Sequence, residues 1–591
     1  MFSTWQHSAK CTAEKNNRSK WFFKFFLQFC LFLLPLLPKA QPGPGNDSVL
    51  KFIFPYRAWS IAIDAKQLDV EETYFTAAVA KAPEYKINTI EFHDNVLEAG
   101  IIESLVEYDS FSVLKNKAAL TYGKDTITKG QRQAYRNRFQ TMLAKAKQNN
   151  IAINVWYHVL RDIPEEVQKE YPQINDIETG FIWTYISSTL AEFFKEFPSV
   201  NRLTLISLHE TPSILKKTGK YSREEILSKL YMTIYNACKQ HNKELIIRDF
   251  IVDSNDYATF WNILEDLPKD IFIMTKSVLA DWSHLNLAIN PYMHLYKGRK
   301  LIVEFDLYGE WSGRGDFPVC YPDDIIRHLR ESKAVDAIGA VGRLIHDTRP
   351  ASDLPFKTIF DSPLDINCFV FSKYLSEPMP WLGQTHAKWH EDMEAINKST
   401  WMIWANERYG KAASVAVVRA LERTAEINSL TFNIAGLSTR YYVWYPTFFK
   451  MHPPNSSKVV DTWNVFRTQL EAVGIDYLKD EKKRALKLAD ESLKDIMSTK
   501  GKISPAQHKQ LQRLFENMII IIKAYDLALD GFYQVYLSKK ANDFAGRKKA
   551  SDALKSYAKE IGRLRGTDWY FDISRDVNIL ANEVLKGETT H

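Results

Sequence analysis

Three acidic side chains share one face of an apolar stretch, LIVEFDLYGEWSGRGD, at Leu301–Asp316. Side chains alternate between the two faces of a strand, so Glu304, Asp306 and Glu310 point the same way. Burying a carboxylate is costly unless it is paired or hydrogen-bonded, and a glycine-rich loop surrounds the end of this run. The segment predicts either the mouth of a barrel active site or a solvated edge strand with ordinary surface acids.

Polar and aromatic groups recur where the other predicted strands end. They are Asp64, His93, Asp94, Asn95, Tyr157, His158, His209, Glu210, Arg248, Asp249, Lys276, Asp281, Trp282, Trp311, Arg343, His346 and Asp347. In a barrel of alternating strands and helices, function collects at the carboxyl ends of the strands. Carboxylates and amides can bond sugar hydroxyls, and aromatic faces can stack on sugar rings. The inventory therefore favours an oligosaccharide or polysaccharide substrate.

Hydrolysis of a glycoside needs one carboxylic acid to protonate the leaving oxygen and a carboxylate on the opposite side. Glu210 follows the fourth predicted strand, Asp281 follows the sixth, and Glu310 follows the seventh. Any one of them could be an ordinary salt-bridge or capping acid. Their joint occurrence at strand ends predicts Glu210, Asp281 and Glu310 as the catalytic residues.

Four histidines raise the alternative of a metal-dependent hydrolase. They are His93, His158, His209 and His346. The first predicted strand has no His-x-His pair, and neither the fifth nor the sixth ends in histidine. We therefore expect no metal and no cofactor, and interpret His93, His158 and His209 as hydrogen-bond partners of substrate hydroxyls or as satisfied core residues.

Aromatic residues near the strand ends could stack on a sugar ring. Trp156, Trp282 and Trp311 are the candidates, although each could equally belong to the core. Arg314, in the glycine-rich loop, is a further substrate-binding candidate.

These residues must be positioned by a regular alternation of strands and helices. Strands are predicted at Ala58–Ile63, Thr89–Phe92, Ala152–His158, Leu203–Leu208, Leu245–Asp249, Ile271–Thr275, Leu301–Leu307 and Ala337–Gly342. Amphipathic helices are predicted between them, for example at Gln131–Asn149, Phe181–Phe197, Arg223–His241 and Asp323–Ser332. Eight such units predict an α/β fold, a (β/α)8 TIM barrel over residues 51–378. A doubly wound open sheet is the alternative, but no GxGxxG follows the first strand.

The last third of the chain, residues 379–591, has helical periodicity without evident strands. Helices are predicted at Lys411–Ile427, Val459–Val473, Lys479–Met497, Pro505–Leu527 and Arg547–Gly562. This pattern predicts an all-helical C-terminal domain packed on the barrel. The apolar run Met518–Ile522 could line an oligomer interface or belong to the core.

The first forty residues have the sequence features of an export signal. A basic region precedes FFLQFCLFLLPLLP, and the small residue Ala40 comes before Gln41. We expect a signal peptide at 1–40, a linker at 41–50, a secreted or periplasmic protein, and no membrane span after cleavage. An uncleaved membrane anchor is the alternative.

The net charge is only +6 over 591 residues, so the composition does not indicate a nucleic-acid-binding protein. Three of the five cysteines follow the signal, so a disulfide framework is not expected and one bridge stays open.

Three segments resemble glycoside hydrolase family 67, the xylan α-1,2-glucuronidases. VEFDLYGEWSG at Val303–Gly313 is similar to that family's strand-seven pattern, and Lys276 with Asp281 matches its Lys-x-x-x-x-Asp. LISLHETPS is similar to its acid-bearing segment, and IIRDF to the segment of an arginine that contacts the uronate. The resemblance implies Glu210 as general acid, Glu310 with Asp281 as general base, and Arg248 with Lys276 as the site for an anionic group.

The chain also departs from that family. A family N-terminal β-rich domain has no counterpart before the barrel, Ile206 stands where the family has a lysine, and the family's Ser-Glu at the fourth strand is His209-Glu210. We therefore expect a divergent, inverting, α-glucuronidase-like exo-enzyme that removes a uronic acid from a plant or algal polysaccharide. The alternatives are a retaining exo-glycosidase on another sugar and a non-catalytic carbohydrate-binding barrel.

Overall fold

The computed structural model describes most of the chain. The described residues are 53–63, 68–93, 101–161, 163–206, 215, 220–251, 254–278, 289–310, 313, 315, 317–347, 351–377, 386–438, 462–541, 544–564 and 573–586. The predicted signal peptide, the linker and the boundary at 378/379 lie outside them.

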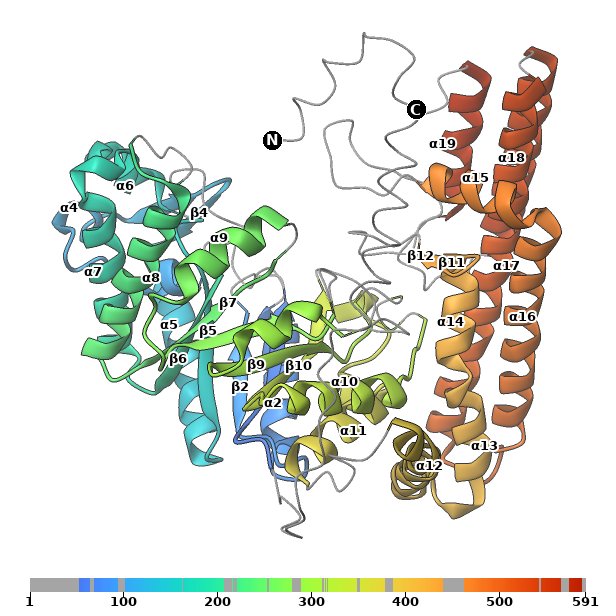
Figure 1. Ribbon diagram of the computed structural model, residues 1–591, viewed down its shortest axis with the longest axis horizontal. Coiled ribbons are helices and arrows are strands. Elements are labelled where there is room, and N and C mark those ends of the chain that lie inside the picture. The colour runs from blue at the N-terminus through green and yellow to red at the C-terminus, as the bar shows by residue number, and fades with distance from the viewer. Residues whose placement is uncertain are drawn as a thin grey trace. The chain divides into compact units, whose positions relative to one another are not determined.

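Eight parallel strands close into a barrel in the order β1-β10-β9-β8-β7-β6-β5-β2 (Figure 1). The strands are β1 (Tyr56–Ile63), β2 (Thr89–Phe92), β5 (Ala152–His158), β6 (Val200–Ile206), β7 (Glu244–Arg248), β8 (Phe272–Lys276), β9 (Lys300–Asp306) and β10 (Gly339–Asp347). Each overlaps one of the eight predicted strands. The predicted (β/α)8 barrel is thereby confirmed, and the open-sheet alternative is wrong because β1 pairs with β10 and closes the sheet.

Helices connect the strands and cover the barrel. The α-helices are α2 (Leu68–Lys81), α3 (Ile101–Leu105), α4 (Ser112–Lys115), α5 (Lys129–Gln148), α6 (Glu165–Glu170), α7 (Phe181–Glu196), α8 (Arg223–Gln240), α9 (Ser254–Leu264), α10 (Pro322–Ala334) and α11 (Asp365–Ser376). Short 3-10 helices are η3 (Pro172–Asn175), η4 (Ile177–Thr179), η6 (Pro291–Tyr296), η7 (Ala351–Asp353) and η8 (Ile359–Asp361). Capping boxes start α5 at Thr128 and α8 at Ser222, which satisfies backbone N–H groups that lack partners in the first turn.

A hairpin that we did not predict lies between β2 and α5. It consists of β3 (Ala119–Tyr122) and β4 (Asp125–Thr128), antiparallel and separate from the barrel. Each strand has only four residues, and buried and exposed side chains alternate weakly along it. The alternation of apolar and polar residues is therefore too short to predict a strand.

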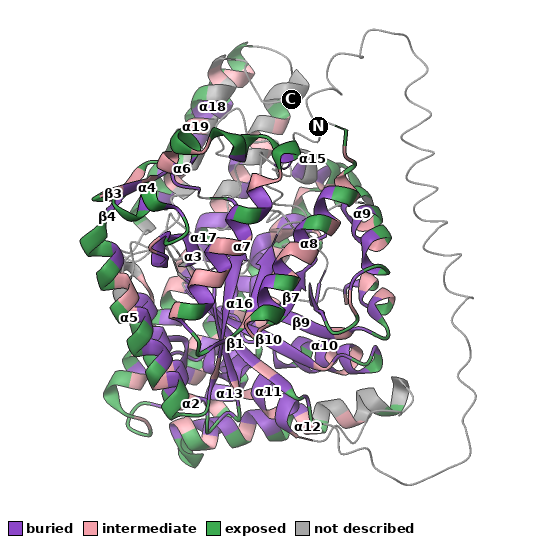
Figure 2. Ribbon diagram, turned by 90° about the vertical axis from the view of Figure 1, so that its left-hand side faces the viewer, coloured by how far each residue is buried: buried purple, intermediate pink, exposed green. Residues whose placement is uncertain are grey.

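The barrel interior holds an apolar cluster of its own, separate from the core between strands and helices. It contains Tyr56, Ala58, Trp156, Ile206, Ile246, Phe272, Met274, Ile302 and Val341. The opposite face of β9 supplies Leu301, Val303 and Phe305 to the outer core. The two faces predicted for this strand are therefore confirmed. Figure 2 shows the strands buried and the outward face of α5 exposed.

A bulge interrupts β10 near its carboxyl end. Ser60 of β1 pairs with Arg343, but the next residue, Ile61, pairs with Ile345, so Leu344 is the extra residue. A bulge shifts the alternation of faces by one position. Arg343 and His346, three residues apart, consequently both contact the same residue inside the barrel mouth, Glu310.

Long helices make up the C-terminal region. They are α12 (His386–Tyr409), α13 (Lys411–Glu422), α14 (Thr424–Phe432), α15 (Thr462–Val473), α16 (Ile475–Met497), α17 (Pro505–Ala541), α18 (Phe544–Leu564) and α19 (Ile573–Lys586). The helical character of this region agrees with the prediction. No described helix has the length and apolar character needed to cross a membrane.

Two predictions for this region were wrong in detail. The single helix predicted at Lys411–Ile427 is two helices, because the Thr424 hydroxyl accepts the backbone N–H of Cys320 and donates to the carbonyl of Leu421. Such side-chain bonds compete with helical backbone bonds. A two-residue hairpin, β11 (Asn433–Ile434) and β12 (Leu437–Ser438), also occurs where we expected no strands.

Two open questions from the sequence are answered by burial. Within Met518–Ile522, Met518, Ile521 and Ile522 are fully buried in the core of this chain, so the run is core. The cysteines among the described residues, Cys238, Cys320 and Cys368, are buried free thiols.

Candidate active site

The structure brings part of the predicted site together at the carboxyl ends of the strands. His93, Trp156, His158, Arg248, Lys276 and Glu310 lie in the described residues. Glu210, Asp281, His209, Trp282, Trp311 and Arg314 lie outside them.

Glu304, on the inner face of β9, is held between two arginines. Its Oε2 accepts from Arg248 Nε at 2.7 Å, and its Oε1 accepts from Arg343. All three side chains are buried. Burial opposes ionisation of the carboxyl, but the two guanidiniums and Lys276 outweigh it and lower the pKa of Glu304 to about 2. Glu304 is therefore an ionised carboxylate that fixes both arginines.

Glu310, the predicted catalytic glutamate, lies in the turn after β9. Its Oε2 is 2.5 Å from Arg343 Nη1, and its Oε1 is 2.5 Å from His346 Nδ1. Burial raises its pKa, but His346 and Arg343 outweigh that effect and hold the pKa well below the usual range of a glutamate. Arg343 thus bridges two buried carboxylates, Glu304 and Glu310.

Asp306 shapes the turn that carries Glu310. Its carboxylate accepts the backbone N–H groups of Tyr308 and Gly309 at 3.0 Å and of Glu310 at 2.7 Å. Burial, followed by repulsion from the Glu310 carboxylate, raises the pKa of Asp306 to about 7. The face predicted for Asp306 is correct, and its role here is to position the turn.

Lys276, at the end of β8, faces the same group of charges. Burial, followed by the neighbouring Arg248, lowers its pKa to about 7 against the opposing effect of Glu304. Its Nζ lies 5.0 Å from the centroid of the Phe250 ring, and the Arg248 guanidinium lies 4.5 Å from the same ring. Two cations and one aromatic face thus meet beside Glu304, which is a favourable surface for an anionic group.

Trp156 lies beneath this cluster and is fully buried. The His93 ring packs on it at 3.9 Å between centroids, and the Arg248 guanidinium lies 5.1 Å from its ring. Its indole N–H donates to Glu91 Oε2 at 2.7 Å. Trp156 therefore supports His93 and Arg248 and does not present an open face to a sugar.

Two of the other histidines considered from the sequence, His158 and His346, lie near His93. Its ring centroid is 5.6 Å from that of His158 and 5.7 Å from that of His346. Burial and then Arg343 hold the pKa of His93 well below its usual range, so the ring is neutral. Within the described ranges, no three His, Cys, Asp or Glu side chains are placed to hold a metal ion.

Sequence reasoning did not select several residues that organise this site. Glu304, Arg343 and His346 were noticed at strand positions but not chosen, and Glu91 was missed. Glu91 stands in Thr-Ile-Glu-Phe, a lone acid on the apolar strand β2. That is the signal that pointed to Glu304, so the same alternation argument could have found it.

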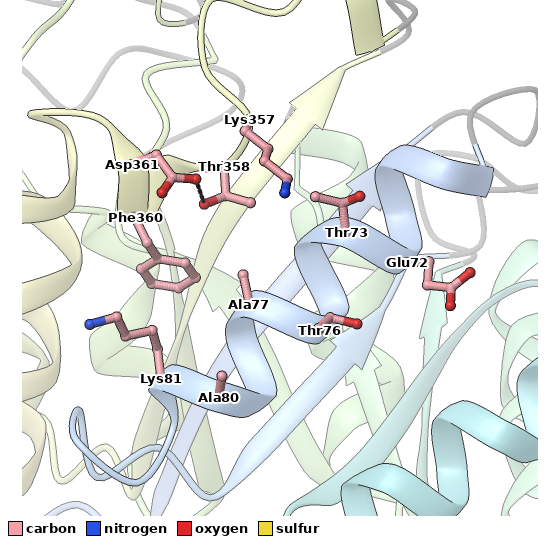
Figure 3. A pocket seen from close by; sticks show the side chains of 10 residues that line it. All are labelled: Glu72, Thr73, Thr76, Ala77, Ala80, Lys81, Lys357, Thr358, Phe360 and Asp361. Atoms are coloured by element: carbon pink, nitrogen blue, oxygen red, sulfur yellow. Dashed lines mark hydrogen bonds between the residues drawn. The ribbon is translucent and has the colours of Figure 1, made fainter. Parts of the chain in front are cut away.

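A separate groove of about 670 Å³ lies outside the barrel. Figure 3 shows its lining from α2 and the segment that carries Lys357 to Asp361. Polar groups in and beside the groove are paired with one another, for example Thr358 with Asp361 at 2.7 Å and Lys81 with Glu84 at 2.8 Å. It shares no residue with the charged cluster, and we do not regard it as the active site.

Comparisons with known proteins support the fold. No protein-family model matches the sequence, and no curated protein resembles it in sequence. Among solved structures, the chain is similar to a GH138 enzyme targeting pectin rhamnogalacturonan II, with a TM-score of 0.60 and 12% identity over 91% of this chain and 83% of that chain. An O-GlcNAc hydrolase of Thermobaculum terrenum matches at a TM-score of 0.40 and 12% identity, over 90% of this chain and 95% of that chain, and we draw nothing from it. These neighbours are glycoside hydrolases by their descriptions; neither is described as a family 67 enzyme.

Proposed function

We propose that the protein is a glycoside hydrolase that removes a uronic acid from an acidic polysaccharide or its oligosaccharides. The observation that carries this proposal is the buried cluster at the strand ends, in which Arg248, Arg343 and Lys276 surround Glu304 and Glu310. The cluster combines an ionised carboxylate, which can stabilise positive charge on the basic side of the reaction, with cations suited to an acidic sugar.

The cations outnumber the low-pKa carboxylates with which they share this site. The negative charges of Glu304 and Glu310 balance those of Arg248 and Arg343. The protonated form of Lys276 has no such balance, as its lowered pKa indicates, and a bound anion would stabilise it. A uronate carboxylate would supply that anion. The GH138 neighbour is described as targeting a pectin, which is an acidic class of polysaccharide, and this agrees with the proposed substrate.

The proposed chemistry is single displacement with inversion, as in the α-glucuronidases of family 67. Glu210 protonates the glycosidic oxygen, while Glu310 and Asp281 provide the basic side that deprotonates water. This mechanism requires Glu210 to stand roughly 6.5–9.5 Å from the base, whereas a retaining enzyme would place the two carboxyls about 5 Å apart.

The proposed location of the protein is outside the cytoplasm, either in the periplasm or secreted from the cell.

The test is release of sugar from a matched panel. Each acidic oligosaccharide, including glucuronoxylan and pectic fragments, is paired with a neutral analogue that has a hydroxymethyl group in place of the carboxylate. Wild-type protein should release uronic acid from at least one acidic member, and Glu310→Gln should lower kcat by at least a hundredfold.

The other outcomes assign the alternatives. Turnover of only the neutral members would mean a glycosidase for another sugar, and retention of configuration, followed by NMR, would replace inversion. Binding of the acidic members without any turnover would identify a non-catalytic carbohydrate-binding barrel.

A further inference from the structure

Glu310 is poorly placed to accept a proton from water by itself. Both of its oxygens are engaged, Oε1 with His346 Nδ1 at 2.5 Å and Oε2 with Arg343 Nη1 at 2.5 Å. Those partners also hold its pKa well below the usual range, and a carboxylate of low pKa is a weak general base. A basic role for this position calls for a second group.

His346 meets the geometric requirements for that group. The side chain of His346 is 11% exposed, whereas that of Glu310 is 2% exposed, so of this pair His346 reaches further toward solvent. Nδ1 of His346 lies 2.5 Å from Glu310 Oε1 and 3.1 Å from Arg343 Nη1. The ionised carboxylate is the nearer partner and only accepts hydrogen bonds, so we assign the ring hydrogen to Nδ1, and Nε2 becomes the nitrogen through which the ring exchanges a proton. The bulge at Leu344 is what brings this ring onto Glu310.

We propose that His346 is the proton acceptor of this site and that Glu310 orients it. This proposal rests on the proposed function and refines it, since Glu310 would then act through the imidazole. The oxygen of water forms a bond to the anomeric carbon while the glycosidic C–O bond breaks. The water proton passes to His346 Nε2, and the leaving oxygen receives the bond's electron pair and a proton from Glu210.

The charged groups around His346 fit this role. In the described part of the chain, Glu310 approaches it from the turn after β9, Arg343 from its own strand, and His93 from the end of β2. The Glu310 carboxylate stabilises the imidazolium that forms. Arg343 keeps Glu310 ionised, and the neutral ring of His93 adds no charge.

Two substitutions of His346 separate the role of base from that of packing. In His346→Asn the amide nitrogen occupies about the place of Nδ1, so the bond to Glu310 is kept while the basic nitrogen is lost. We expect kcat on the substrate found in the panel to fall by about 10²–10⁴-fold with KM changed less than threefold. We also expect the acid limb of the pH–kcat/KM profile to disappear, and imidazole to restore activity to His346→Ala.

Near-wild-type kcat and an unchanged acid limb in His346→Asn would overturn the proposal and return the base to Glu310. Histidine ¹⁵N NMR of the full chain gives a readout without substrate, and circular dichroism checks folding. The Nδ1–H tautomer of His346 in wild-type protein, altered in Glu310→Gln, supports the pairing, whereas an Nε2–H tautomer overturns it. Wild-type protein that hydrolyses no glycoside would refute the proposed function, and the catalytic role of His346 with it, whatever the tautomer.

Discussion

Arg343 Nη1 lies 2.5 Å from Glu310 Oε2, although 33 positions separate the two residues in the chain. The same guanidinium also donates to Glu304, so one arginine connects β10 to Glu304 of β9 and to Glu310 of the turn that follows it. Because all three groups are buried, removing the arginine leaves two carboxylates without their shared counter-ion.

We expect Arg343→Met to lower the free energy of unfolding by about 3–5 kcal/mol, the range for breaking a buried ion pair. Denaturant unfolding followed by circular dichroism measures the change. Arg484→Met is the matched control, since its pair with Glu426 is exposed and should contribute at most about 1 kcal/mol. Similar losses in both variants would contradict a special role for Arg343.

Lys276 should make the binding of acidic ligands depend on pH. Its pKa is lowered to about 7 by burial and by Arg248, so the ammonium is present below that pH and lost above it. Affinity for a free uronic acid should therefore fall as pH rises through 7, and binding near pH 7 should take up protons.

Calorimetric titration in two buffers of different ionisation enthalpy measures that proton uptake. Lys276→Met should bind more weakly below pH 7 and abolish the pH dependence in that window. If the variant keeps the wild-type dependence, another group is responsible for it.

Much of this molecule can be predicted from its sequence because one face of each strand is apolar over several residues. The strands β2 and β5 match their predictions residue for residue, and alternation placed Glu304 on the inner face of β9. Local pattern suffices there, since burial of alternate side chains is a property of the segment itself.

The hydrogen bonds between charged side chains at the mouth of the barrel could not be predicted in the same way. Arg343 and His346 share a partner only because β10 has a bulge at Leu344, and nothing in that local sequence indicates the bulge. Arg248 was expected to bind substrate, which stays a prediction, but its bond to Glu304, on the far side of β8, was not foreseen. Such contacts depend on barrel closure and register, which single-segment periodicity does not encode.

Ionisation of Asp306 should lower the free energy of unfolding, whereas ionisation of Glu304 should raise it. The pKa of Asp306 is raised from 3.8 to about 7 by burial and then by Glu310, so the folded state binds this proton more tightly than the unfolded chain. The contribution of Asp306 is then most favourable below about pH 4. It is lost as pH rises to 7, by roughly 1.4 kcal/mol for each pH unit that separates the folded and unfolded pKa values. Asp306→Asn removes this titration.

The measurement is the difference in unfolding free energy between wild type and Asp306→Asn at several pH values. We expect wild type to lose stability relative to the variant as pH increases from 4 to 7. Asp306→Ala serves as the comparison, because it also removes the acceptor of three backbone N–H groups. It should displace Glu310 and therefore lower kcat more than Asp306→Asn does. A difference that does not vary with pH would mean that Asp306 is ionised throughout.

Glu91 of β2 is fully buried, and substitution of it or of one of its hydrogen-bond donors should give effects of different size. Glu91 accepts hydrogen bonds from the Tyr56 hydroxyl, from Trp156 Nε1 at 2.7 Å and from Asn154 Nδ2 at 3.3 Å. Burial raises its pKa, while these three donors lower it. Glu91→Leu leaves the Tyr56 hydroxyl and the Trp156 indole N–H without this acceptor, while Asn154 Nδ2 still donates to the Tyr56 hydroxyl. The substitution should reduce the unfolding free energy by about 3 kcal/mol or more.

Tyr56→Phe removes one of the donors to Glu91 and with it the hydroxyl that accepts from Asn154 Nδ2. It should reduce the unfolding free energy by about 1.5–3 kcal/mol. Because Trp156 carries His93 and Arg248 on its ring, Glu91→Leu should also alter the near-ultraviolet circular dichroism of the folded protein and raise KM for acidic substrates. Tyr56→Phe should leave both readouts close to wild type, since the indole bond persists. Equal effects of the two substitutions would show that Glu91 contributes only general packing, and that Trp156 is held by its apolar neighbours.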